Sequence, residues 1–281
     1  GLKPVHVRNV AGLVFICLAD EPPADFDEVA ARVEPFLAPY EMGKAKVAHQ
    51  VDLVEAGNWK LTMENNRECY HCDGHPELLS AYFPLHGYTK DDVPPRLRKT
   101  WERFEKATAS LEAACARQGF PNEYVRELDN RPSGFMIGHL PLDGAGQSYS
   151  AGGKAVSAKR MGTILDDSFG DLHLHTQPNA WFHMLSDHAV VFAVLPIDKD
   201  KTLVRTTWLV HPDAVEGVDY DVDNLSLVWA ATNAQDGAFV GRTQLGVEDP
   251  GYEPGPYSEV EGDVLAFVNW YVSRVDDYLS A

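Results

Sequence analysis

The chain has 281 residues, with 24 Lys and Arg against 42 Asp and Glu, which gives a net charge of −18. This acid excess argues against nucleic acids and anionic membrane surfaces as partners, because both are bound through Lys and Arg, and no run of 18 apolar residues predicts a membrane span. The composition, 44% hydrophobic and 23% charged, is typical of a globular protein with enough chain for a sizeable core.

The first 55 residues are expected to be rich in strands. Two short apolar runs within HVRNVAGLVFICLA meet near Asn9 and Gly12, which predicts a hairpin. Residues 25–40 have the pattern of a short amphipathic helix, and residues 46–56 alternate like a half-buried strand. The chain starts without Met or a signal peptide, inside a predicted strand, so we expect it to be a piece of a longer protein.

The middle and end of the chain alternate between strands and helices. Residues 58–72 contain no Gly or Pro and are helical in character, and a charged amphipathic helix is expected over 96–118. A Gly/Ser/Ala-rich surface loop over 142–160 precedes four strands between 171 and 212, which predict an antiparallel meander. Helices over about 222–243 and 261–279 complete an α+β domain, with helices on one face of the sheet.

The four cysteines are Cys17, Cys69, Cys72 and Cys115. A secreted disulfide scaffold would be shorter and denser in cysteine, so this count favours a reducing cytoplasm.

The segment ENNRECYHCDGHPEL, residues 64–78, concentrates groups that bind metals. A zinc site of Cys69, Cys72 and the two histidines is disfavoured, because donors so close on one helix point in different directions. A Rieske cluster also pairs two Cys with two His, but it takes them from two separated loops, and no residue separates the pairs here.

A mononuclear metal site is the third hypothesis. His71 and His75 are four residues apart and share one helical face, on which Glu64 and Glu68 complete a stripe. Two histidines and one carboxylate form the facial triad of non-haem Fe(II) oxygenases, and a metal-bound imidazole donates its other N–H to a carboxylate such as Glu68. The alternative is a solvated polar stripe.

Asp236 is the candidate third ligand. The predicted helix over 222–243 has one face that is apolar except for this residue, and a buried carboxylate without a partner is costly. We therefore expect Asp236 to face a cation. The alternative is a helix face that turns to solvent midway.

The segment NWKLTMENNRECYHCDGHPEL resembles the iron motif of Rieske-type non-haem iron oxygenases, in particular the branch acting on quaternary ammonium compounds. Three further segments carry the likeness over nearly the whole chain: GLKPVHVRNVAGLVFICL, LPIDKDKTLVRTTWLVHPDA and QDGAFVGRTQLGVEDPGYEPGPYSEVEGDVLAFVNWY. The family motif is an acidic residue, two residues, His, three or four residues and a second His. It matches Glu68, His71 and His75, with the shorter spacing, and the family's distant Asp matches Asp236.

The resemblance implies a helix-grip (START-like) fold, with a large antiparallel sheet around a long C-terminal helix. Residues 1–281 would be the mononuclear iron catalytic domain, and an N-terminal Rieske [2Fe-2S] domain is expected in the whole protein. It further implies a homotrimer in which Glu68 bridges the iron to the next subunit's cluster, with Glu64 hydrogen-bonding near the iron. A flavin reductase would pass electrons from NAD(P)H through FMN or FAD.

The implied reaction is oxidative N-demethylation of a small betaine with O2, releasing formaldehyde. Stachydrine (proline betaine) is the first expected substrate and glycine betaine the second. The cation needs aromatic faces and the substrate carboxylate a donor such as Arg205. The candidate pocket residues are Trp181, Phe182, Trp208, Tyr149, Phe169, His183 and Asn179.

Alternation along a strand allows only one of Trp181 and Phe182 to point inward, and ordinary core packing is the alternative for every candidate aromatic. His173 and His175 are expected to be structural or on the surface. Two other functions stay open: a ring-hydroxylating dioxygenase, and a non-catalytic ligand-binding module of the same fold.

Overall fold

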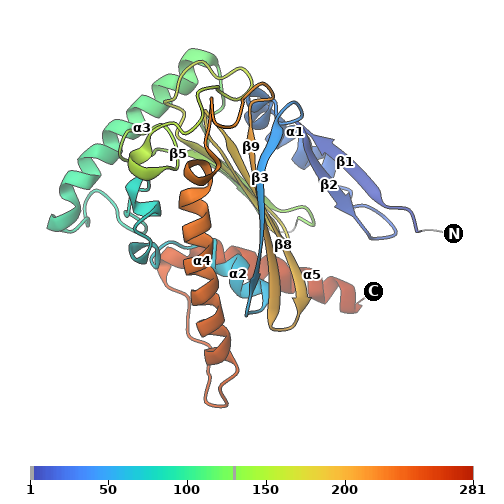
Figure 1. Cartoon of the computed structure of the whole chain (residues 1–281). Helices are drawn as coiled ribbons and strands as arrows, with labels where there is room; N and C mark the ends of the chain where they lie inside the picture. The colour runs from blue at the N-terminus through green and yellow to red at the C-terminus, as the bar shows by residue number, and fades with distance from the viewer. Residues whose placement is uncertain (1–2, 129–130, 281) are drawn as a thin grey trace.

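A seven-stranded antiparallel sheet forms the centre of the molecule (Figure 1). The computed structural model describes residues 3–128 and 131–280. The strands are β1 (His6–Val10), β2 (Leu13–Cys17), β3 (Lys46–Glu55), β4 (Val125–Glu127), β5 (Phe135–Leu140), β6 (Asp171–Thr176), β7 (Ala180–Met184), β8 (Ala189–Asp198) and β9 (Lys201–Val210). The sheet order is β3-β9-β8-β7-β6-β5-β4, so the early strand β3 closes one edge beside the late strand β9. Strands β1 and β2 form a separate hairpin.

In the described part of the chain, five α-helices pack around this sheet. Their bounds are α1 (Phe26–Leu37), α2 (Trp59–Asn65), α3 (Arg98–Gln118), α4 (Val222–Val247) and α5 (Gly262–Ser280). The long helix α4 runs along the sheet, with α2 and α5 beside it, whereas α1 and the hairpin lie away from them (Figure 1). The predicted α+β class is therefore confirmed, but the expectation of helices on one face alone is wrong, because α1 packs against the other.

Two hydrophobic clusters fill the two faces of the sheet. In β7, Phe182 belongs to the cluster that includes α1, and Trp181 belongs to the cluster that includes α2, α4 and α5. This is the alternation expected along a strand. In β6, by the same alternation, Leu172 and Leu174 face α1. His173 and His175 lie on the face of α4. That second face carries the candidate site.

Several predicted elements are confirmed, and one important helix is wrong. The hairpin forms as expected, with Asn9 Oδ1 accepting from the N–H of Gly12 at 2.9 Å. The helix predicted over 58–72 ends at Asn65, after seven residues. Consecutive asparagines at 65 and 66 explain this end, because Asn is a weak helix former that competes for backbone hydrogen bonds. Strands β4 and β5 were not expected.

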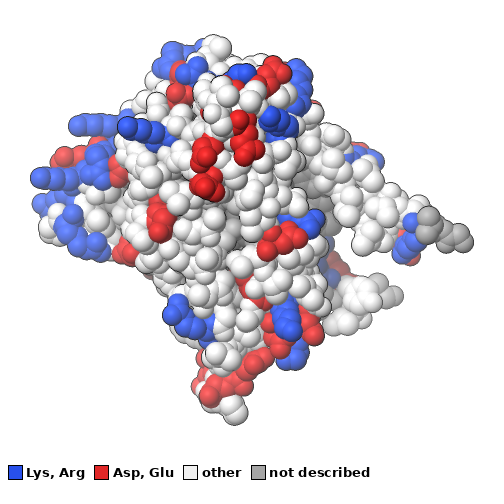
Figure 2. Space-filling view, viewed as in Figure 1, with Lys and Arg blue, Asp and Glu red and all other residues white. Residues whose placement is uncertain are grey.

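Charged side chains of both signs are interspersed over the face seen in Figure 2. The basic ones gather mainly along α3, and acidic ones gather at the tip where α4 ends and the following loop begins. Within the described residues, no helix is long and apolar enough to cross a membrane.

Candidate metal centre

Two hydrogen bonds fix the metal-binding segment against α4. The backbone N–H of Asn58, the residue that caps α2, donates to Gln244 Oε1 at 2.9 Å. Beyond the motif, Gln235 Nε2 donates to Glu77 Oε2 at 2.9 Å. Both contacts join residues more than 150 positions apart in sequence. The segment is therefore held at both ends, on either side of Asp236.

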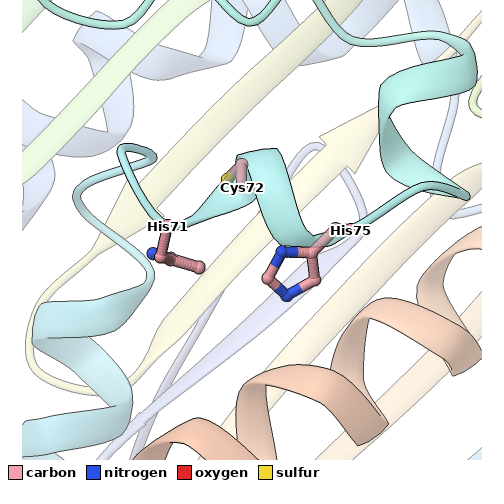
Figure 3. Close-up of side chains that lie close together, drawn as sticks. All are labelled: His71, Cys72 and His75. Atoms are coloured by element: carbon pink, nitrogen blue, oxygen red, sulfur yellow. The ribbon is translucent and has the colours of Figure 1, made fainter.

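The two histidines reach Asp236 from a turn and not from a helix. His71 precedes the short 3₁₀ turn η2 (Cys72–Gly74), and His75 follows it. Their side chains leave the same side of this loop, facing α4 (Figure 3). Asp236 Oδ1 lies 3.1 Å from Nε2 of His71 and 3.0 Å from Nε2 of His75. The helical stripe predicted from Glu64 to His75 is wrong, but the convergence that it was meant to explain is present.

The geometry of these three residues fits a divalent metal. Two ligand atoms that are about 2.1 Å from a metal at right angles lie about 3.0 Å apart, as both histidines do from Asp236. Both ring nitrogens of His75 are buried and lack a hydrogen-bond partner among the described residues, so its Nε2 faces the carboxylate without an aligned N–H bond. Two imidazoles and one carboxylate are the donor set of a non-haem Fe(II) site.

The pKa of His71 also indicates a site that favours a cation. Burial alone would lower its pKa, but the carboxylates of Asp236 and Glu68 outweigh burial and raise the pKa to about 9. The site therefore favours a positive charge between His71 and Asp236. A divalent cation supplies that charge and leaves both imidazoles neutral, as metal ligation requires.

The cysteines beside these histidines are not available as ligands. Cys72 Sγ lies within 4.8 Å of the nearest ring nitrogens of His71 and His75. However, Cys69 and Cys72 are joined by a disulfide, and Cys72 points to the opposite side of the loop (Figure 3). A zinc site using both thiolates is incompatible with this bond. Cys17 and Cys115 are free.

Glu68 contacts the ring nitrogen of His71 that does not face Asp236. Its Oε1 accepts from Nδ1 of His71 at 2.5 Å, and its Oε2 accepts from the N–H of Tyr70 at 3.0 Å. The bond to Nδ1 fixes the tautomer of His71 in which Nε2 is free to bind a metal. Glu68 also lines an outer groove with Glu64 and Tyr257, so it separates that groove from the metal side. Glu64 lines only the groove, where burial raises its pKa although Lys60 opposes this.

A cavity of about 290 Å³ opens beside the triad. It contains five of the chain's eleven histidines, three tyrosines and one tryptophan. Its lining residues are Asn65, Asn66, Arg67, Glu68, Cys69, His71, Cys72, Leu78, Tyr82, His86, Tyr124, Leu140, Tyr149, His173, His175, His183, Trp229, Thr232, Asp236 and Asp263. Its size suits a small ligand, and its aromatic faces suit a cation.

Two of the seven predicted pocket residues line this cavity. Tyr149 and His183 lie in it, and both contact Asp171: the tyrosine hydroxyl donates to Oδ2 at 3.3 Å, and His183 Nδ1 lies 2.7 Å from the same oxygen. Burial, with the Asp171 carboxylate, raises the pKa of Tyr149 well above its usual value. The phenol therefore stays neutral.

The other five lie elsewhere, each for a local reason. Phe182 and Phe169 are in the cluster on the opposite face of the sheet, and Trp208, on β9, is fully buried in the cluster that includes α4. Trp181 lines a separate small cavity of about 30 Å³ that also touches Asp236. Asn179 is engaged in the turn before β7, where its Nδ2 donates to the carbonyl of Val194 at 2.7 Å.

Arg205 is also unavailable as a carboxylate donor, because it forms a bidentate pair with Asp52 on the surface, at 2.8 and 2.7 Å. Trp229, on the same helix face as Asp236, also lines the cavity, although it is not among the predicted pocket residues. Its ring stacks on His183 at 4.3 Å and meets Tyr149 edge-on at 5.0 Å.

His173 and His175, expected to be structural or on the surface, are buried and line the cavity. Burial lowers the pKa of both rings.

Glu55 supplies a test of this buried region. The residue is buried, and burial raises its pKa to about 7, opposed by the Thr62 hydroxyl and helped by the charge of Asp236. The folded protein thus keeps a proton that the unfolded chain loses above pH 4.5, and this stabilisation is lost as pH rises through 7. We expect Glu55→Gln to stabilise the fold by about 2 kcal/mol at pH 8.

Urea unfolding at pH 5.5 and 8 measures this difference, which should shrink at the lower pH. Glu112→Gln, at an exposed position of α3, is the control. It should change the free energy of unfolding by the same amount at both pH values. A Glu55→Gln variant that is less stable at pH 8 than at pH 5.5, relative to wild type, contradicts the argument.

Comparison with known proteins places this geometry in a family. The family model described as "Ring hydroxylating alpha subunit (catalytic domain)" matches residues 42–277. The glycine betaine monooxygenase oxygenase subunit of Pseudomonas aeruginosa (strain UCBPP-PA14) is 43% identical over 279 residues, and that of Chromohalobacter salexigens is 41% identical over 283. The matches cover 98% of this chain but 62% and 61% of those proteins.

Solved structures share the fold at low sequence identity. A quaternary ammonium Rieske monooxygenase superposes with a TM-score of 0.56 at 15% identity, covering 96% of this chain and 62% of the other. Naphthalene 1,2-dioxygenase with bound indole gives 0.52 at 17% identity, covering 96% and 64%. These likenesses confirm the sheet-and-helix architecture expected above. Because the family model matches most of the sequence, the chain belongs to the ring hydroxylating alpha subunits, within their catalytic domain.

Proposed function

We propose that this chain is the catalytic domain of an oxygenase that removes an N-methyl group from a small quaternary ammonium betaine, using O2 and releasing formaldehyde. The observation that carries the proposal is the convergence of His71, His75 and Asp236 beside a cavity with aromatic faces. The names of the most similar relatives favour glycine betaine, with proline betaine as the second candidate.

The roles of the chain's residues follow from their contacts. His71, His75 and Asp236 would hold Fe(II), which supplies O2 activation when bound. The cavity beside these three residues would receive the substrate. Glu68 orients His71 through the hydrogen bond to its Nδ1. Trp229 and Tyr149 line the cavity and would supply aromatic contacts, which attract a quaternary ammonium without needing an N–H.

The partners of the whole protein are part of this proposal. The matched relatives are longer than this chain, which spans about 62% of their length. We propose that the whole protein also carries a Rieske [2Fe-2S] domain, that a flavin reductase feeds it with electrons from NAD(P)H, and that a homotrimer brings one subunit's cluster to the next subunit's Glu68. Support comes from the family match and from the position of Glu68 between the metal side and the outer groove.

The direct test is product analysis with the full-length oxygenase subunit, its reductase and NADH. Glycine betaine, proline betaine, carnitine and an arene are supplied separately, and formaldehyde, demethylated amine and hydroxylated arene are measured. We expect stoichiometric formaldehyde from a betaine and no arene diol. Arene oxidation without formaldehyde would establish the ring-hydroxylating alternative, and no turnover with bound ligand would favour a binding module.

Trp229 should decide how tightly the ammonium group binds. Replacing it with Phe keeps an aromatic ring but weakens the cation contact, so we expect KM for the betaine to rise roughly threefold, while Trp229→Ala raises it about tenfold or more. Steady-state kinetics with full-length protein measures both. Trp208→Phe, a buried Trp outside the cavity, is the control for loss of an indole. If KM rises equally in Trp229→Phe and Trp208→Phe, Trp229 does not contact the substrate.

A further inference from the structure

Arg67 is the one Lys or Arg that lines the metal-side cavity within the described chain. Its side chain is buried, with 5% of the residue exposed. One terminal nitrogen donates to the carbonyl of Met63 at 2.5 Å, the other donates to Gln177 Oε1 at 2.8 Å, and the ring of Phe267 lies 4.4 Å from the guanidinium carbon. Arg67 is thus held rigidly by neutral groups.

Its positive charge has no direct partner. Among residues 3–128 and 131–280, no carboxylate lies within 4.0 Å of the guanidinium nitrogens, and its Nε–H lacks an acceptor. A guanidinium has five N–H groups, so three remain after the two bonds to protein. Burial lowers the pKa of Arg67 to about 9, which leaves the group charged at neutral pH. A buried cation in this state is costly unless an anion joins it.

The acidic groups of the cavity are already engaged. Glu68 accepts from His71, Asp236 faces the two ring nitrogens, and Asp263 pairs with Arg126 at 2.8 Å. The charges of Asp263 and Glu64 act on Arg67 from a distance and raise its pKa against burial, but neither carboxylate lies within 4.0 Å of the guanidinium nitrogens.

The ring of His175 adds a neutral donor beside Arg67. Burial, and then the positive charge of Arg67, lowers the pKa of His175 well below its usual value. An uncharged imidazole can donate an N–H without adding a second charge. The part of the cavity that Arg67 and His175 line is therefore suited to an anion.

We propose that Arg67 binds the carboxylate of the substrate and selects zwitterionic betaines over quaternary ammonium cations that lack a carboxylate. This inference rests on the proposed function. A carboxylate completes the guanidinium's donors and compensates its charge, whereas a cation such as choline brings a second positive charge into the same cavity. Arg67 is accordingly a specificity-determining residue and does not take part in oxygen chemistry.

Gln177 offers a nearly isosteric way to test this. Its Oε1 already accepts from Arg67, and its Nε2 is buried without a partner. Gln177→Glu therefore places a carboxylate against the guanidinium, pairs the charge internally and leaves Arg67 in position. In Arg67→Gln the charge is removed, and in Arg67→Lys it is kept without the forked donors.

The experiment is anaerobic titration calorimetry of the full-length, iron-loaded subunit with glycine betaine and with choline. For glycine betaine, Kd should rise at least 30-fold in Arg67→Gln and about tenfold in Gln177→Glu. In Arg67→Lys it should rise by a factor between these two. For choline, Kd should stay within threefold of wild type or fall. Circular dichroism and iron content check that each variant is folded.

The outcomes separate the two claims. If folded Gln177→Glu and Arg67→Lys leave the ratio of the two Kd values within threefold of wild type, the inference is wrong, even if Arg67→Gln does not fold. Equal weakening of both ligands also overturns it. If the wild-type protein binds neither ligand, the proposed function itself fails, and the inference with it.

Discussion

Replacing Asp236 with Ala is expected to abolish both iron binding and turnover. Its Oδ1 is the atom toward which both imidazoles point, at 3.1 and 3.0 Å, and no other carboxylate on α4 faces them. Changes one step removed from a metal already cost about 10–100-fold in affinity, so loss of a direct ligand should cost at least about 100-fold. Metal analysis after reconstitution with Fe(II), and formaldehyde release, measure the two losses.

The control is Asp223→Asn, at an exposed position in the first turn of the same helix. It removes one negative charge from α4 without touching the site, so iron content should equal that of wild type. His71→Ala and His75→Ala should resemble Asp236→Ala. If Asp236→Ala binds iron stoichiometrically and turns over, the third ligand has been wrongly identified, and the proposed chemistry loses its basis.

Glu68→Gln should separate iron binding from electron delivery. A glutamine has one acceptor oxygen where Glu68 uses two, for His71 and for the Tyr70 N–H, so one buried donor loses its acceptor. We expect iron affinity to fall about tenfold and multiple turnover about 100-fold or more. If Glu68 also carries electrons from the neighbouring subunit's cluster, reoxidation of that cluster by O2 in stopped-flow should slow by the larger factor.

Glu261→Gln is the matched control. It lies in the same outer groove, near Tyr70, whose hydroxyl donates to it at 3.4 Å, but it makes no contact with His71. Its turnover should stay within about threefold of wild type. Were Glu68→Gln to lose iron and cluster reoxidation by the same factor, Glu68 would only orient His71.

The sequence predicts which side chains converge on α4 better than it predicts their local structure. His71 and His75 do converge, but through a 3₁₀ turn that a helix-based argument misses, because Asn65 and Asn66 end α2 early. Asp236 could be found because α4 is long and regular, so one polar residue on an apolar face is visible in the pattern.

The substrate pocket is far less predictable. Which strand residues face a cavity depends on pairing register and on which helix covers each face. These long-range properties bring His173 and His175 of β6 beside Arg67, although the chain separates them by more than 100 residues. A charged residue such as Arg67, following a predicted helix, has an ordinary surface pattern. Its burial comes from Phe267 and Gln177, which no local signal connects to it.

The two hydrogen bonds that hold the motif against α4 determine when, during synthesis and folding, the chain can bind iron. Asp236 follows His71 by 165 residues, and β8, β9 and α4 must all be in place before Gln244 and Gln235 can hold the loop. A nascent chain therefore has two histidines but no third ligand until α4 has left the ribosome. Iron should be acquired after translation, and its release should loosen the contact between the early and late parts of the chain.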